Sequence, residues 1–374
     1  MMKKTVLMCL VALVALVGCK RDPVDIYKQN ESGVVMVLNK FYYKMRLPNG
    51  RYLYFSGLDE DGNLENLTDV EEKIRNNAQV SFGTVFFVDD RGTMLTNRHV
   101  ASPPIDRDLV KQGFAQLVRS VAAGLELRMQ ELEQEYRALE LQRSDDSYYY
   151  DDEGNLVQEE ADNTDIDYRQ QQLQQAYFEL EANLSNVEQL SDASQIDIKP
   201  VCQLGIAYDN SHVNSDADFL QRNPCTVVRM AGDEDVDLAL LRLDNGTTPR
   251  GVHVFDIAGS RSGWLSRLLG RGNGDDDLKI NSKVYMIGYN AGPVVGSTRR
   301  GIKAQFTSGN VTQQPDGQRV LYSIPTVEGS SGSPVVDENG NLVAVNFAKL
   351  AVGHAENFNF GIPLSKVKQF MRLK

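Results

Sequence analysis

The sequence EGSSGSPV, residues 328–335, holds Ser331 in a Gly-x-Ser-Gly turn. A turn of this kind can present the serine hydroxyl while the backbone N–H groups of Gly329 and Ser331 face the oxyanion of a tetrahedral intermediate. Downstream, Asn339-Gly340 is a β-hairpin signal, so the serine leads into strands rather than into a helix. The stretch therefore indicates a candidate nucleophile in a β-rich setting.

A serine hydroxyl is a poor nucleophile at neutral pH and needs a neighbouring base to accept its proton. His99, in the sequence TNRHV of residues 96–100, suits that role because imidazole titrates near neutrality. Asp237 opens the apolar segment DLALL and could orient the imidazole, with Asp235 as a weaker competitor. The candidate catalytic residues, in chain order, are His99, Asp237 and Ser331.

Together, TNRHV, DLALL and GSSGSP resemble the three signature blocks of trypsin-like peptidases, and most closely those of bacterial Deg/HtrA-type and glutamyl-endopeptidase-like members. The sequence NFGIP, residues 359–363, followed by Val367, resembles the closing strand and C-terminal helix of the HtrA catalytic domain. No PDZ domain is expected after it. The α/β-hydrolase elbow is excluded because its triad runs serine, acid, histidine and its serine leads into a helix.

The resemblance implies a mainly β fold of two six-stranded antiparallel barrels, with the active site in the cleft between them. It implies a serine endopeptidase that forms an acyl-enzyme and requires no metal or organic cofactor. The oxyanion hole would consist of the Gly329 and Ser331 amides. A protein or peptide would be the substrate.

The expected substrate pocket departs from that of a Lys/Arg-selecting enzyme. Pro325 occupies the position six residues before the nucleophile, where a selecting acid would lie, and Thr326 follows it. The wall strand reads Asn346-Phe347-Ala348, where many relatives have small glycines. We therefore expect a preference for small or apolar side chains before the cut.

A helical insertion separates His99 from Asp237. Apolar residues recur at three- and four-residue steps from Phe114 to Leu139 and again from Leu173 to Val187, which predicts an antiparallel, coiled-coil-like hairpin over residues 106–192. The connector, residues 144–167, is rich in Asp and Glu, has no basic residue and contains three consecutive tyrosines. Two interpretations remain open: a solvated tip, or a docking surface for a protein partner.

Around this insertion, period-two and β-branched segments predict strands. The first strands expected are Gly33–Leu38, Phe41–Leu47 and Arg51–Phe55, with a turn at Pro48-Asn49-Gly50. The first barrel would comprise residues 33–105 and 193–245, and the second would comprise residues 246–374 with a C-terminal helix. Trp264–Leu269 is expected to form a local packing turn.

The N-terminus predicts export and lipidation. Two lysines precede an apolar run that is too short for a comfortable membrane span, which is the layout of a secretory signal peptide. The ending Leu16-Val17-Gly18-Cys19 resembles a bacterial lipobox, and this resemblance implies a lipoprotein signal peptide over residues 1–18. The alternative is a plain signal peptide with an incidental cysteine. Cys19 would carry acyl chains that hold the protein on a membrane surface, and residues 19–32 would form a polar tether. A bacterial, extracytoplasmic location follows. The outer membrane is favoured because Lys20, rather than aspartate, follows the lipidated cysteine.

Composition and cysteine content add three constraints. The hydrophobic fraction of 41% permits a sizeable core, and the net charge of −12 argues against nonspecific nucleic-acid binding. With Cys9 and Cys19 assigned to the signal and the lipid, only Cys202 and Cys225 remain, either as a disulfide or as two thiols. A non-enzymatic alternative is a latent or inactive protease-fold lipoprotein that binds a partner through its helical hairpin.

Overall fold

The computed structural model describes residues 21–233, 236–258, 278–349 and 359–372. Two compact units emerge. The first contains the described residues up to Phe41, Ala78–Pro104 and those from Pro200 onward, and the second contains Tyr42–Asn77 and Ile105–Lys199. Every predicted catalytic residue lies in the first unit.

A closed barrel of six strands forms one half of the first unit. Its strands follow the order β1-β5-β6-β11-β10-β9, and a further pairing of β9 with β1 closes the ring. The strands are β1 Val34–Arg46, β5 Gln79–Phe87, β6 Thr93–Thr96, β9 Asp197–Ala207, β10 Pro224–Met230 and β11 Ala239–Leu243. The prediction of a first six-stranded barrel is confirmed.

Strand β1 is apolar at consecutive positions because both of its faces are covered. Val35 and Val37 face one buried cluster together with Val85 and Phe87, whereas Val34 and Met36 belong to another. The two expected strands Gly33–Leu38 and Phe41–Leu47 are therefore one continuous strand in the structure. Burial on both faces explains why alternation alone did not define its length.

A second six-stranded sheet completes the first unit as a curled half-barrel. Its order is β15-β12-β17-β18-β19-β16, where the strands are β12 Lys283–Gly288, β15 Gln305–Asn310, β16 Val320–Tyr322, β17 Pro334–Val336, β18 Leu342–Lys349 and β19 Asn359–Pro363. Its edges do not pair as strands in the described ranges; an isolated bridge between Val311 and Tyr322 and a few neighbouring hydrogen bonds join them. The expected closed second barrel is thus a curled sheet. Helix α10, Leu364–Arg372, follows as predicted.

Short elements connect these sheets. They are η1 Glu31–Gly33, α4 Arg98–Ala101, α7 Asp216–Leu220, α9 Gly292–Gly296, β13 Ser297–Thr298 and β14 Gly301–Ile302. Together, the closed barrel and the curled half-barrel are consistent with a chymotrypsin-like fold. The segment Trp264–Leu269 lies outside the described residues.

The segment expected as a tether is instead helical from Pro23 to Asn30, helix α2. Asp22 caps the helix by accepting a hydrogen bond from the Val24 amide, and Pro23 occupies a first-turn position that tolerates its missing N–H. Ile26 is fully buried in the main core cluster. This burial anchors α2 to the first unit, and a tether before residue 23 stays a prediction.

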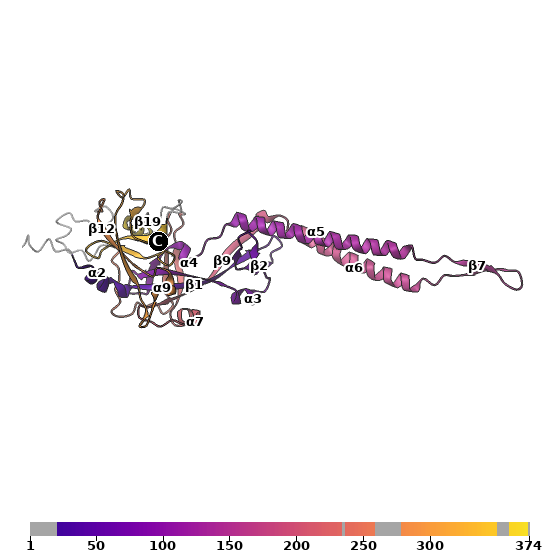
Figure 1. The fold of residues 1–374 in the computed structure, drawn as a ribbon, viewed down its shortest axis with the longest axis horizontal. Helices are drawn as coiled ribbons and strands as arrows, with labels where there is room; N and C mark the ends of the chain where they lie inside the picture. The colour runs from indigo at the N-terminus through magenta and orange to yellow at the C-terminus, as the bar shows by residue number, and fades with distance from the viewer. Residues whose placement is uncertain (1–20, 234–235, 259–277, 350–358, 373–374) are drawn as a thin grey trace, which may run out of the picture. The chain divides into compact units, whose positions relative to one another are not determined.

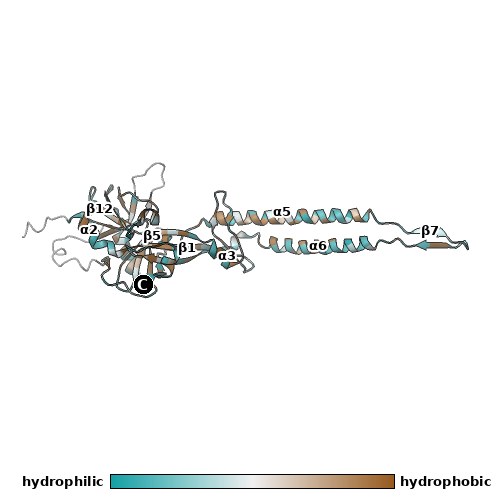
Figure 2. Cartoon of the chain, turned by 60° about the horizontal axis from the view of Figure 1, so that its bottom comes forward, coloured by the Kyte–Doolittle hydropathy of each residue, from teal (hydrophilic) through white to brown (hydrophobic). Residues whose placement is uncertain are grey.

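The second unit contains the expected helical hairpin. Helix α5, Arg107–Glu140, and helix α6, Thr164–Glu188, run side by side (Figures 1 and 2). Val110, Phe114 and Leu132 are buried on α5, as is Leu173 on α6. Many other apolar side chains of the predicted stripe stay partly exposed, including Leu117 and Val121. A coiled-coil supercoil remains a prediction.

The acidic connector between these helices is more ordered than a solvated tip would require. It forms a two-stranded ribbon of β7 Ser147–Tyr150 and β8 Leu156–Glu159. Asp151 stabilises the intervening turn by accepting hydrogen bonds from the amides of Glu153 and Asn155. All three tyrosines of β7 are exposed.

Residues 42–77 group with the insertion rather than with the first barrel to which the sequence assigned them. They form β2 Tyr52–Phe55, β3 Gly57–Leu58, β4 Leu64–Glu65 and α3 Glu71–Asn76, and η2 Ala193–Gln195 lies later in the same unit. Glu71 fixes this layer by accepting hydrogen bonds from the hydroxyls of Tyr42 and Tyr54. Such contacts between distant residues leave no local periodicity to detect.

None of the helices in the described ranges is both long and apolar enough to cross a membrane.

Candidate active site

His99 and Asp237 meet where β6 ends and β11 begins. His99 lies in the one-turn helix α4, which starts directly after β6. Its Nδ1 lies 2.5 Å from Asp237 Oδ2, and its backbone N–H donates to Asp237 Oδ1 at 3.0 Å. With Nδ1 donating to the carboxylate, Nε2 is left to accept a proton.

A third residue holds the acid in place. The side-chain amide of Asn97, which is fully buried, donates to the Asp237 carbonyl at 2.9 Å. Asn97 thus ties the start of β11 to the segment that carries His99. The weaker competitor Asp235 lies outside the described residues.

The serine loop, residues 328–333, is fixed through four successive carbonyls. The Glu328 carbonyl accepts a hydrogen bond from Ala291 N at 2.6 Å, and the Gly329 carbonyl accepts one from Thr84 Oγ1 at 2.9 Å. The Ser330 carbonyl accepts from Asn346 Nδ2 at 3.0 Å, and the Ser331 carbonyl accepts from Thr84 N at 2.9 Å. Every peptide plane from Glu328 to Gly332 is therefore held by a partner outside the tight turn.

This arrangement sets the direction of the candidate oxyanion donors. In a trans peptide the N–H points opposite to the carbonyl of the same plane, so fixing the Glu328 and Ser330 carbonyls also fixes the amides of Gly329 and Ser331. No acceptor for either amide is found among the described residues. Both N–H groups are thus available for an oxyanion, in the way that acyl-transfer chemistry requires.

Two glycines let the loop take this shape. Gly329 has φ of 91° and Gly332 has φ of 84°, a region that disfavours side chains. A Cβ on Gly332 would lie 2.1 Å from the Thr84 carbonyl oxygen and 2.3 Å from Thr96 Oγ1. Gly332 therefore lets the loop contact β5 and β6, the second of which leads to His99.

Ser331 itself is half-buried within this loop. In the part of the chain that the structure describes, no hydrogen bond joins its hydroxyl to His99. Catalytic hydrogen bonds are often long before substrate binds and tighten in the complex. The structure thus brings His99 and Asp237 into direct contact and places the serine loop against the strands that lead to His99.

The expected pocket residues divide into two kinds. Pro325 is exposed and Phe347 is half-buried, with its ring 4.7 Å from that of Phe360. Thr326 and Asn346 are instead buried and hydrogen-bonded internally, Thr326 to Asn359 at 2.6 Å and Asn346 to Ser330. Their side chains are therefore occupied within the fold and do not line an open pocket. The side chain of Ala348 lies outside the described set.

Sequence reasoning missed Thr84, which bonds the serine loop through both its backbone and its side chain. Its hydroxyl also accepts from Tyr289 N at 3.0 Å, and its carbonyl accepts from Thr96 Oγ1 at 2.8 Å. The residue is fully buried. A hydroxyl inside an otherwise apolar strand, as in the sequence GTVFF of residues 83–87, was the available signal.

Cys202 and Cys225, the cysteines of the described ranges, are free thiols. Cys225 lies on β10 opposite Leu204 of β9, two residues beyond Cys202. Burial raises the pKa of the Cys225 thiol to about 12 and also raises the pKa of Cys202. Both thiols are protonated at neutral pH.

One comparison with known proteins bears on this geometry. The family model described as a trypsin-like peptidase domain matches residues 207–345. This match supports a trypsin-like serine peptidase. The matched residues cover less than half of the chain; they include Asp237 and Ser331 and begin after His99. No curated protein matches the chain.

The peptidase-domain match ends at Val345, directly before Asn346, and begins after the helical insertion. The geometry therefore adds the histidine, which the matched residues do not include. This histidine lies upstream of the insertion and is already bonded to the matched aspartate.

Proposed function

We propose that this chain is a serine endopeptidase that hydrolyses peptide bonds through an acyl-enzyme, of a type similar to the Deg/HtrA-type and glutamyl-endopeptidase-like enzymes. The observation that carries the proposal is the contact of His99 with Asp237, by both the imidazole and the backbone N–H. The prearranged amides of the serine loop support it independently. No cofactor enters the reaction.

The residues of the site account for each step. Ser331 Oγ attacks the scissile carbonyl while His99 Nε2 takes the hydroxyl proton, and Asp237 stabilises the imidazolium. The oxyanion accepts hydrogen bonds from the amides of Gly329 and Ser331. His99 then gives the proton to the leaving amine as the C–N bond breaks, and water hydrolyses the acyl-enzyme by the same route.

Fluorophosphonate labelling tests the activated nucleophile, because the probe phosphonylates only an activated serine and releases fluoride. We expect the wild type to be labelled and Ser331→Ala to remain unlabelled. His99→Gln should label at least 100-fold more slowly, since base catalysis contributes about that much or more.

Two matched controls accompany these variants. Ser308→Ala and His212→Gln replace exposed residues of the same types in the same unit, and both should label like the wild type. Persistent labelling of Ser331→Ala would assign the nucleophile elsewhere. An unreactive wild type would favour the non-enzymatic alternative.

For location, we propose a lipid anchor on Cys19 that holds the protein outside the cytoplasm of a bacterial cell, on the outer membrane. The support is the basic, apolar and cysteine-terminated order of residues 3–19. Metabolic labelling with an alkynyl fatty acid should mark the wild type and not Cys19→Ser. Recovery of the label in the inner-membrane fraction would correct the assignment of the membrane.

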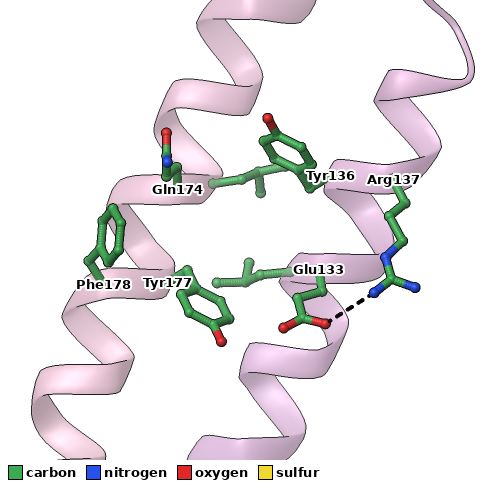
Figure 3. A pocket seen from close by; sticks show the side chains of 8 residues that line it. Glu133, Tyr136, Arg137, Gln174, Tyr177 and Phe178 are labelled. Atoms are coloured by element: carbon green, nitrogen blue, oxygen red, sulfur yellow. Dashed lines mark ion pairs between the residues drawn. The ribbon is translucent and has the colours of Figure 1, made fainter.

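A second function, binding of a partner through the hairpin, is favoured by a specific surface. A groove of about 280 Å³ between α5 and α6 is lined by five apolar or aromatic side chains, together with Gln174 and the ion pair of Glu133 with Arg137. Figure 3 shows Tyr136 and Tyr177 pointing into the space between the helices. Residues 126–188 contain 18 acidic and four basic side chains, a formal charge of −14. The occupant we propose is therefore a Lys-rich amphipathic helix.

Fluorescence anisotropy with a labelled Lys–Leu amphipathic peptide tests this surface. Tyr136→Ala should weaken binding by about tenfold, which corresponds to ~1.4 kcal/mol. Tyr168→Ala serves as the matched control, because Tyr168 is exposed on α6 and does not line the groove. Equal affinities for the two variants, or equal binding of a Glu–Leu peptide, would exclude the groove as the docking site.

A further inference from the structure

Asn346 joins the serine loop on both sides of Ser331. Its Nδ2 donates to the Ser330 carbonyl at 3.0 Å and to Ser330 Oγ at 3.2 Å. Its backbone carbonyl accepts from Gly332 N and its backbone N–H donates to the Ser333 carbonyl, each at 2.9 Å. Only 2% of the residue is exposed, so water does not compete for these bonds.

The orientation of the Asn346 side chain is set by Tyr322. The Tyr322 hydroxyl, fully buried on β16, donates to Asn346 Oδ1 at 2.8 Å. The opposite amide orientation would place Oδ1 against the Ser330 carbonyl, bringing two acceptors together. Only the observed orientation therefore satisfies both ends of the amide.

This chain of contacts ends at a catalytic group. The Ser330 carbonyl and the Ser331 N–H belong to one planar peptide, so a partner that fixes the carbonyl also fixes the direction of the N–H. We propose that Asn346, oriented by Tyr322, is a positioning residue that aims the Ser331 amide at the oxyanion. The proposal rests on the serine endopeptidase function proposed above.

The size of the effect follows from what remains when Asn346 is removed. Ser333 N also donates to the Ser330 carbonyl, at 3.1 Å, so the peptide would loosen rather than detach. Loss of a whole oxyanion donor typically lowers kcat by about 100- to 1,000-fold. We therefore expect Asn346→Leu, a replacement of similar volume, to lower kcat by roughly 10- to 100-fold.

The experiment measures hydrolysis of 4-nitrophenyl acetate by the full-length protein under single-turnover and steady-state conditions. Asn346→Leu should lower the acylation rate and kcat while the substrate dissociation constant from single turnover stays within twofold. Tyr322→Phe, which removes only the orienting hydroxyl, should lower kcat by a smaller factor. Because the two residues act in series, the double variant should be no slower than Asn346→Leu alone.

Asn30→Leu provides the matched control. Asn30 is an equally buried asparagine of the first unit whose side chain donates to the Ile26 carbonyl on α2. This variant should lose stability and keep kcat, which separates a burial effect from a positioning effect.

The outcomes separate the two proposals. A wild type whose turnover is abolished by Ser331→Ala, together with a folded Asn346→Leu variant of unchanged kcat, would overturn the positioning role and leave the peptidase intact. Turnover that survives Ser331→Ala would overturn both. A weaker substrate dissociation constant at an unchanged single-turnover acylation rate would assign Asn346 to substrate binding instead.

Discussion

Replacing Thr84 by valine should destabilise the first unit without changing its shape. The Thr84 hydroxyl donates to the Gly329 carbonyl and accepts from the Tyr289 amide, and the residue is fully buried. Valine is nearly equal in size, so no cavity opens, but two buried backbone groups lose their partner. Each such group costs about 1–3 kcal/mol, which predicts a loss of about 2–6 kcal/mol.

Thr84→Ser separates the hydroxyl from the methyl group. Serine keeps both hydrogen bonds and loses one buried methyl, a change of about 1 kcal/mol. Urea denaturation followed by circular dichroism should therefore rank the variants as wild type, Thr84→Ser and Thr84→Val, in order of falling stability. Fluorophosphonate labelling should follow the same rank, because the Gly329 carbonyl anchors the serine loop. A valine variant at least as stable as the serine variant would refute the reasoning.

Three further predictions concern other parts of the fold. Gly332→Ala should destabilise the protein by more than about 3 kcal/mol because its Cβ would overlap the Thr84 carbonyl; Gly317→Ala, which has a similar φ of 76° and nothing within 4 Å, should cost only about 1 kcal/mol in a urea titration. Cys225, whose pKa burial raises to about 12, should resist alkylation at pH 8 until the protein unfolds, as mass spectrometry would show; recovery of a peptide cross-linked to Cys202 would contradict the free thiols. Hydrogen bonds from Tyr42 and Arg75 lower the pKa of Glu71 to about 2, so its stabilisation is complete above about pH 4.5 and is lost as the pH falls towards 2; Glu71→Gln should flatten the stability of the second unit over that window, and an unchanged profile would count against this ion pair.

Much of the site could be predicted because each of its catalytic residues lies in a short, characteristic segment of sequence. Ser331 and its glycines form one turn, and His99 and Asp237 each border an apolar strand, so residue type and strand context were enough to pair them. Strands of the first barrel and the helices of the hairpin follow from periodicity of two and of three to four residues, whereas the barrel itself was implied by the resemblance to trypsin-like peptidases. These signals are local, and each can be found without knowing what the segment packs against.

The positioning contacts could not be predicted, for the opposite reason. Thr84 and Gly329 are 245 residues apart in the sequence. Tyr322 on β16 bonds Asn346 on β18, although β19 lies between these two strands in the curled sheet. Asn346 was expected in the pocket because only its strand was known, not the direction of its side chain. Helix α2 was missed for another reason. Asp22-Pro23 is a typical helix start, but the polar composition of the segment favoured the prediction of a tether.

The insertion between His99 and Asp237 has a consequence for the order of folding events. Their contact spans 138 residues, a separation that makes chain closure slow. If α5 and α6 pair first, residues 107–188 behave as one rigid body. The flexible chain between His99 and Asp237 then shortens to roughly 60 residues. The entropy of closure then falls by about 1 kcal/mol. The hairpin would in this way shorten the search for the partner of His99, so that formation of the catalytic pair follows a local helical event rather than awaiting a random encounter.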